Sequence, residues 1–116
     1  MELEAFRIEE RSQDGRHTLI LEGELDMASA PALEGMFEQL LEAGARELVV
    51  DLSRLEFMDS TGLNAILRCQ ALCDEHLCDL GLIPGASRVQ RVFELTRLTD
   101  RLPFRWAGEA QRAAPR

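Results

Sequence analysis

The sequence contains no lysine: all 13 of its basic residues are arginine, against 21 acidic residues, and the formal net charge is −8. Binding to a nucleic-acid backbone or to an anionic membrane surface needs clustered basic side chains, so this balance argues against both partners. The longest apolar run is about four residues, whereas a membrane-spanning helix needs about 20. The N-terminal segment MELEAFRIEE is acidic and lacks the layout of a signal peptide. We therefore expect a cytoplasmic protein.

Cysteine is scarce and odd in number, with Cys69, Cys73 and Cys78 lying within ten positions. An odd count in a cytoplasmic protein does not describe a disulfide scaffold. Together with His76 the three thiols would supply four ligands for zinc, although their spacing is not that of a standard zinc motif. Free cysteine commonly acts as a small buried apolar residue. We expect packing and no cofactor, with the metal site as the open alternative.

A chain of 116 residues is long enough for one hydrophobic core and too short for two, and 46% hydrophobic residues is ordinary for a globular protein. We predict one domain over residues 1–116, with the folded core at about 4–106. The small and polar residues of 107–116 predict a flexible tail.

The N-terminal segment carries the signals of a β-hairpin. Phe6 and Ile8 alternate with polar residues, which is typical of a half-buried strand. An Asp-Gly pair at 14–15 predicts a tight turn, and HTLIL at 17–21 predicts the partner strand. Gly23 is expected to end this strand and to open a loop.

The central segment predicts a helix, a buried strand and a second helix. The first helix is expected to start at Ser29 and to end at Gly44. The nearly continuous apolar run at 47–52 is typical of a strand buried on both faces and parallel to a neighbour. The second helix is expected to begin at 59–60. The two predicted apolar stripes are Leu33, Met36, Phe37, Leu40 and Leu41, and then Leu63, Ile66, Leu67, Gln70 and Ala71.

The C-terminal segment predicts a strand at 77–83, a break at 84–85 and a third helix capped by Ser87. The buried stripe of this helix is expected to be Val89, Val92, Phe93 and Thr96. A short edge strand is predicted at 102–104, where a proline is tolerated. Strands that alternate with helices after an initial hairpin predict an α/β fold with a small mixed sheet.

The turn Asp-Ser-Thr-Gly at 59–62 is the candidate functional site. In such folds partners meet the loops just past the strand ends, and a helix N-terminus carries unpaired N–H groups and partial positive charge. A phosphate on Ser60 would suit that helix end, and would conflict with Asp59 and with Asp26 if the earlier loop packs beside it. Gly62 would allow close approach of a partner. The alternative is structural: Asp59 as a helix cap and Asp26 as the residue closing an Asx-turn.

The sequence argues against a third hypothesis, an enzyme that uses Ser60 as its nucleophile. Such chemistry needs a histidine base within hydrogen-bond reach. The chain has only His17, in a predicted strand, and His76, near the far end of the second helix. We therefore expect no catalytic residues.

Three segments share the order and spacing of a known family: EGELDMASAPAL (22–33), LVVDLSRLEFMDSTGL (48–63) and PGASRVQRVFELTRL (84–98). On these motifs the chain resembles STAS domains, and in particular the bacterial anti-sigma factor antagonists, over about residues 4–106. The resemblance implies a single STAS-type domain whose small mixed sheet has its helices packed mainly on one face.

The resemblance also implies a mechanism. An anti-sigma factor that is itself a serine kinase would phosphorylate Ser60 and then release the antagonist, and a serine phosphatase would reset it. The unphosphorylated antagonist would bind the anti-sigma factor and free its sigma factor. By the same resemblance Asp26, Asp59, Thr61 and Gly62 belong to the partner-binding surface, and Thr61 is a second hydroxyl that could accept phosphate. The alternative function is a STAS scaffold subunit of a transporter or stress-sensing complex, without a direct sigma circuit.

Overall fold

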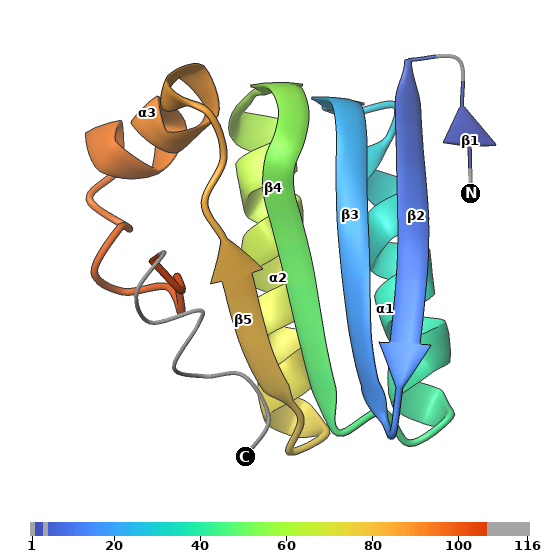
Figure 1. Cartoon of the computed structure of the whole chain (residues 1–116). Coiled ribbons are helices and arrows are strands. Elements are labelled where there is room, and N and C mark those ends of the chain that lie inside the picture. Colours follow the sequence, from blue (N-terminus) through green and yellow to red (C-terminus); the bar gives the residue numbers. More distant parts are fainter. Residues whose placement is uncertain (1, 4, 107–116) are drawn as a thin grey trace.

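The computed structural model describes residues 2, 3 and 5–106, with side chains described from residue 5. One mixed sheet of five strands, in the spatial order β1-β2-β3-β4-β5, is combined with three helices (Figure 1). The elements are β1 (Glu2–Leu3), β2 (Phe6–Gln13), β3 (Arg16–Leu25), α1 (Ala30–Glu42), β4 (Glu47–Met58), α2 (Ser60–Glu75), β5 (Asp79–Ile83) and α3 (Ser87–Leu95).

The pairing of the strands follows the chain order. β2 and β3 form the antiparallel hairpin, and Asp14 and Gly15 both adopt positive φ (53° and 80°), as a two-residue hairpin turn requires. β3 and β4 are parallel, as are β4 and β5, with α1 and α2 as the respective connections. The predicted α/β fold with a mixed sheet is confirmed.

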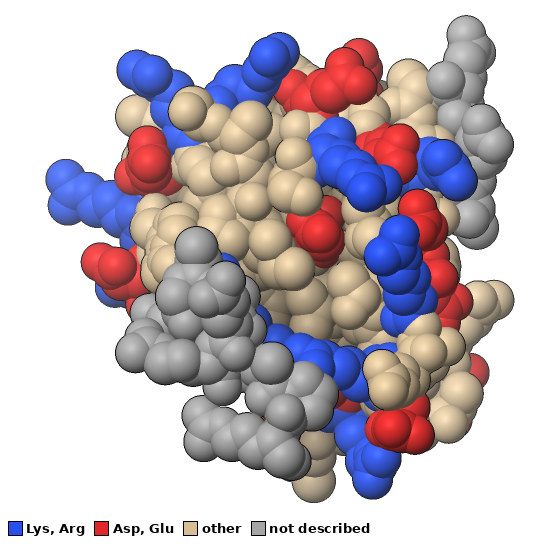
Figure 2. All heavy atoms as spheres, viewed as in Figure 1, with Lys and Arg blue, Asp and Glu red and all other residues tan. Residues whose placement is uncertain are grey.

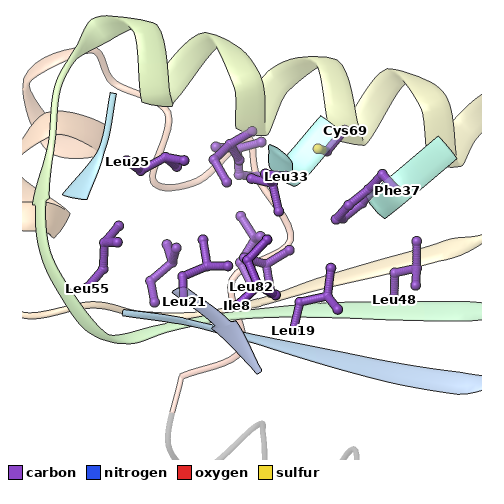
Figure 3. Packing of buried hydrophobic residues seen from close by; sticks show 14 of the residues in the cluster. Ile8, Leu19, Leu21, Leu25, Leu33, Phe37, Leu48, Leu55, Cys69 and Leu82 are labelled. Carbon is purple, nitrogen blue, oxygen red and sulfur yellow. The ribbon is translucent and has the colours of Figure 1, made fainter. Parts of the chain in front are cut away.

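The hydrophobic core lies between the sheet and the helices. In Figure 1, α1 and α2 lie behind the sheet, and they pack against each other as well as on it. Figure 3 shows Leu19 and Leu48 of the sheet opposite Phe37 of α1 and Cys69 of α2; all four are buried. The expectation that the helices pack mainly on one face is confirmed.

The other face of the sheet carries paired charges. Figure 2 looks onto this face and shows basic and acidic side chains interspersed. Glu22 of β3 stands directly between Arg7 of β2 and Arg54 of β4, with N–O distances of 3.9 Å and 3.3 Å. Such exposed pairs contribute about 0–1 kcal/mol each, so they add little to the stability of the sheet.

The prediction that Gly23 ends the second strand is wrong. β3 continues to Leu25, and the register against β4 shifts at Gly23, whose φ is +93°. A Cβ at this position would overlap the Ala5 carbonyl, and the Glu24 N–H donates to the same carbonyl at 2.9 Å. The glycine therefore permits an irregularity within the strand and brings Asp26, rather than Gly23, to the strand end.

Other boundaries also differ from the prediction. β4 runs to Met58 as one strand of 12 residues, and β1 was not predicted. β5 starts at Asp79 rather than at residue 77. Ser87 is the first residue of α3 and not its cap, because Ala86 holds that position. The predicted edge strand at 102–104 is reduced to one bridge between Phe104 and Leu82.

The buried face of α2 consists of Gly62, Leu63, Ala65, Ile66, Cys69 and Cys73. Ala71 is exposed, and the prediction that it lines the inner face is wrong. All three cysteines are free and buried, as packing predicts. Across residues 5–106 no group of three or more potential ligands is placed to hold a metal ion, and His76 is exposed. The predicted tail, 107–116, lies outside the described residues.

In the part of the chain that the structure describes, no helix combines the length and the apolar character needed to cross a bilayer.

Candidate functional site

Two loops meet at the edge of the sheet where β3 and β4 end. The last residues of these parallel strands, Leu25 and Met58, are register partners. The Asp59 N–H donates to the Leu25 carbonyl, with a donor–acceptor distance of 3.4 Å. Asp26 and Asp59, which follow the two strands, therefore lie on neighbouring loops at the carboxyl edge of the sheet, where ligands and partners of α/β folds are commonly bound. The condition that the earlier loop packs beside the 59–62 turn is therefore met.

Asp59 is the N-cap of α2. Its backbone is extended, and its Oδ1 accepts hydrogen bonds from the Thr61 N–H (3.0 Å) and the Gly62 N–H (3.1 Å). A carboxylate here satisfies two unpaired donors and interacts favourably with the helix dipole. The structural role considered for Asp59, that of a helix cap, is confirmed, and two of the N–H groups that a phosphate could bind already bind Asp59.

Ser60 is the first residue of α2 and is exposed. Its hydroxyl makes no hydrogen bond within the described part of the chain. The neighbouring Thr61 is partly buried. Of the two hydroxyls in the turn, that of Ser60 is therefore the more accessible to another protein.

Gly62 is buried, and its environment explains why a glycine is needed. A Cβ added here would overlap the Leu25 carbonyl and would lie 2.7 Å from Cγ of Met58. The close approach that this glycine permits is therefore internal: it seats the first turn of α2 against the end of β3. This packing accounts for the glycine, and a role of Gly62 in binding a partner stays a prediction.

Asp26 organises the loop that precedes α1. Its Oδ1 accepts from the N–H groups of Ala28 (3.0 Å) and Ser29 (3.2 Å), and its carbonyl accepts from the Ala30 N–H at 2.8 Å. The structural role considered for this residue, closure of an Asx-turn, is thus confirmed. The Asp26 carboxylate helps to fix the loop next to the α2 N-terminus.

Ser29 holds the same loop from inside. It is 2% exposed, its hydroxyl donates to the Glu24 carbonyl at 2.7 Å, and that hydroxyl accepts from the Asp26 N–H at 2.9 Å. It occupies the N-cap position of α1 as predicted, but its side chain bonds to the end of β3 and not to the helix. The loop is therefore fixed from both sides.

Two exposed apolar side chains near the site were not predicted from the sequence. Met27 lies in the loop between Asp26 and α1 and is 77% exposed, and Phe57 precedes Met58 at the end of β4 and is also exposed. The detectable signal for Met27 was a large apolar residue inside a loop otherwise made of small and polar residues.

The two histidines lie far from Ser60 in the topology. His17 is near the start of β3, at the opposite end of the strand from this site, and its Nδ1 lies 2.8 Å from a Glu10 carboxylate oxygen. His76 follows the C-terminal end of α2. Neither is placed to activate the Ser60 hydroxyl as a histidine base.

Comparison with known proteins agrees with this architecture. The sequence matches the family model described as "Mlab, STAS domain" over residues 8–103. It is 31% identical over 95 residues to an anti-sigma-B factor antagonist of Staphylococcus aureus (strain NCTC 8325 / PS 47), covering 82% of this chain and 88% of that protein.

Two solved structures extend the likeness to the fold. An anti-sigma factor antagonist from Mycobacterium paratuberculosis superposes with a TM-score of 0.76 at 27% identity, covering 86% of this chain and 85% of the other. The Bacillus cell fate determinant SpoIIAA in its phosphorylated form has a TM-score of 0.70 at 22% identity, with coverage of 93% and 96%. The chain therefore belongs to the STAS domain family, among the anti-sigma factor antagonists.

Proposed function

We propose that this protein binds a kinase-type anti-sigma factor, thereby frees the sigma factor, and is switched off by phosphorylation of Ser60. The observation that carries the proposal is the Ser60 hydroxyl, which is exposed and makes no hydrogen bond to any residue that the structure describes. It lies at the start of a helix that the Asp59 side chain caps. The named relatives support the antagonist role, and the phosphorylated form of SpoIIAA supports phosphorylation as a state of this fold.

The switch follows from charge. Transfer of the γ-phosphoryl group of ATP to the Ser60 Oγ adds about −1.5 to −2 charge at neutral pH. Since Asp59 already occupies two N–H groups of the first turn, the phosphate cannot be fully neutralised by the helix end. The added charge therefore remains at the surface beside Asp59 and Asp26, where it would repel an acidic partner group and add a desolvation cost to binding. A serine phosphatase restores the binding form.

The unmodified surface offers an exposed apolar side chain on the loop that neighbours the acceptor turn. Met27 is exposed on a loop that Asp26 and Ser29 fix in place, so its burial by the anti-sigma factor would cost little ordering of the loop. Asp26 and Asp59 serve the interface by holding this shape, and Thr61 lies next to the acceptor. In this proposal the protein acts in the cytoplasm. It is the substrate of the kinase and is not itself an enzyme.

The direct test is phosphorylation of the purified full chain by its anti-sigma factor kinase and ATP, with the modified residue identified by mass spectrometry. We expect one phosphate, at Ser60, and none on the Ser60→Ala variant. Ser87→Ala is the matched control, because Ser87 is also an exposed serine at the first position of a helix. It should be phosphorylated like the native protein. Phosphate at Thr61 in the native protein would refute the assignment of the acceptor.

A binding experiment separates the two functions under consideration. Ser60→Asp should weaken binding to the anti-sigma factor, and Ser60→Ala should retain it. Equal binding of Ser60→Asp and the native protein would refute the electrostatic switch. Recovery of a transporter ATPase, with no serine kinase, as the specific partner would favour the scaffold function instead.

A further inference from the structure

The C-terminal end of α2, opposite to Ser60, has a specific backbone geometry. Leu77 adopts a left-handed conformation (φ 55°) directly after the C-cap His76. The Cys78 N–H donates to the Cys73 carbonyl at 2.9 Å, and the Leu77 N–H donates to the Asp74 carbonyl at 3.3 Å. These two hydrogen bonds define a Schellman motif, which reverses the chain and brings the side chains at its two outer positions into contact.

Both outer positions are cysteines. Cys73 lies in the last turn of α2, and Cys78 lies just before β5. Both side chains are buried, and the Cys78 Sγ donates to the Asp79 carbonyl at 3.6 Å. Each of the two thiols also shifts the pKa of the other, as neighbouring groups do. The usual occupants of these positions are apolar residues in contact, and a disulfide needs about the same separation, with Cα atoms roughly 4.4–6.8 Å apart.

We propose that Cys73 and Cys78 are a disulfide-forming pair, oxidised reversibly by a two-electron oxidant of the peroxide class. The Cys78 thiolate attacks one oxygen of hydrogen peroxide, the O–O bond breaks, and a sulfenic acid and hydroxide form. The Cys73 sulfur then attacks the Cys78 sulfur and displaces the hydroxyl group as water. In sum, two thiols and one peroxide give one disulfide and two waters, and a thiol reductant reverses the step.

The environment assigns the first attack to Cys78. Cys78 is 6% exposed and Cys73 is 0% exposed, so a small oxidant reaches Cys78 first. Burial raises the pKa of Cys73 to about 12, and the nearby Cys78 thiol adds to this effect. Burial also raises the pKa of Cys78, but the neighbouring Cys73 thiol acts in the opposite direction and favours the Cys78 thiolate.

The disulfide would join the last turn of α2 to the start of β5 without involving Ser60. The two sites lie at opposite ends of a helix of 16 residues. Oxidation should therefore leave phosphorylation of Ser60 unchanged, and the two modifications should be independent. Cys69, one helical turn before Cys73, is buried in the core and should stay reduced.

The experiment is oxidation of the purified full chain by hydrogen peroxide, followed by alkylation of the remaining thiols and digestion after arginine and glutamate. Cleavage after Arg68, Glu75 and Arg88 separates residues 69–75 from residues 76–88. We expect these two fragments to remain joined until a reductant is added, in the native protein and in the Cys69→Ala variant. They should not be joined in the Cys73→Ala variant.

The rate of joining should rise roughly tenfold per pH unit between pH 7 and 8, because the attacking species is the thiolate. If a variant fails to fold, the native protein is sufficient for the test. Sequencing of its joined fragments identifies whether Cys69 or Cys73 is linked to Cys78. A bond from Cys69, a bond between two molecules, or oxidation to sulfinic acid without a linkage would each overturn the proposal.

Discussion

Gly62→Ala is the sharpest test of how the α2 N-terminus is built. An alanine in place of glycine in a helix interior normally stabilises by about 1 kcal/mol. At Gly62 the added methyl group would overlap the Leu25 carbonyl and crowd the Met58 side chain, and inserting a methyl group into such packing costs about 1–3 kcal/mol. Because the obstacle is backbone, which cannot rotate away, we take the upper part of that range and expect a net loss of about 1–2 kcal/mol.

Gly35→Ala is the matched control, since Gly35 lies in α1 and an added Cβ there would meet no atom within 4 Å. This variant should be more stable than the native protein by about 0.5–1 kcal/mol. Thermal unfolding followed by circular dichroism should show the Tm of Gly62→Ala lower by roughly 4–8 °C and that of Gly35→Ala higher by several degrees. If both substitutions raise the Tm alike, the close packing of α2 against β3 described here is wrong.

Three further outcomes follow from the same geometry. Asp59→Ala should lower the free energy of unfolding by about 1 kcal/mol through loss of the helix cap, and Asp59→Asn should be close to the native protein. Equal free energies of unfolding for the two variants in urea denaturation would refute the cap. Leu77→Gly should stabilise by about 0.5–1 kcal/mol, because the leucine is 93% exposed and held at positive φ; a lower Tm would show that the side chain contributes contacts. Since the pKa of Cys73 is raised to about 12 in the folded state, the unfolded chain loses this proton first, and stability should fall as pH rises from about 8.5 towards 12. Cys73→Ala should reduce this alkaline loss, and an unchanged pH profile would contradict the burial of the thiol.

The periodic elements of the fold were predictable from the sequence because burial imposes their pattern. The stripe through Leu33 and Phe37 and the apolar run at 47–52 identified α1 and β4, since both face the core. The extension of β3 past Gly23 was not predictable in this way. Glycine usually marks a strand end, and here the carbonyl of Ala5, remote in sequence, accepts the hydrogen bond that continues the strand.

At the site, too, features that depend on nearby residues were predictable, and features that depend on residues remote in sequence were not. The Asp59 cap and the Asx-turn at Asp26 depend on residues within three positions along the chain, so sequence patterns could predict them. The reason for Gly62 could not be read locally, because the Leu25 carbonyl comes from a different strand. The exposure of Met27 likewise depends on how the whole loop is anchored.

The central claim is tested most directly by the affinity of the anti-sigma factor for the purified protein with and without phosphate on Ser60, measured by isothermal titration calorimetry. We predict at least tenfold weaker binding of the phosphorylated form, equivalent to about 1.4 kcal/mol or more. Equal dissociation constants for the two forms would contradict the account.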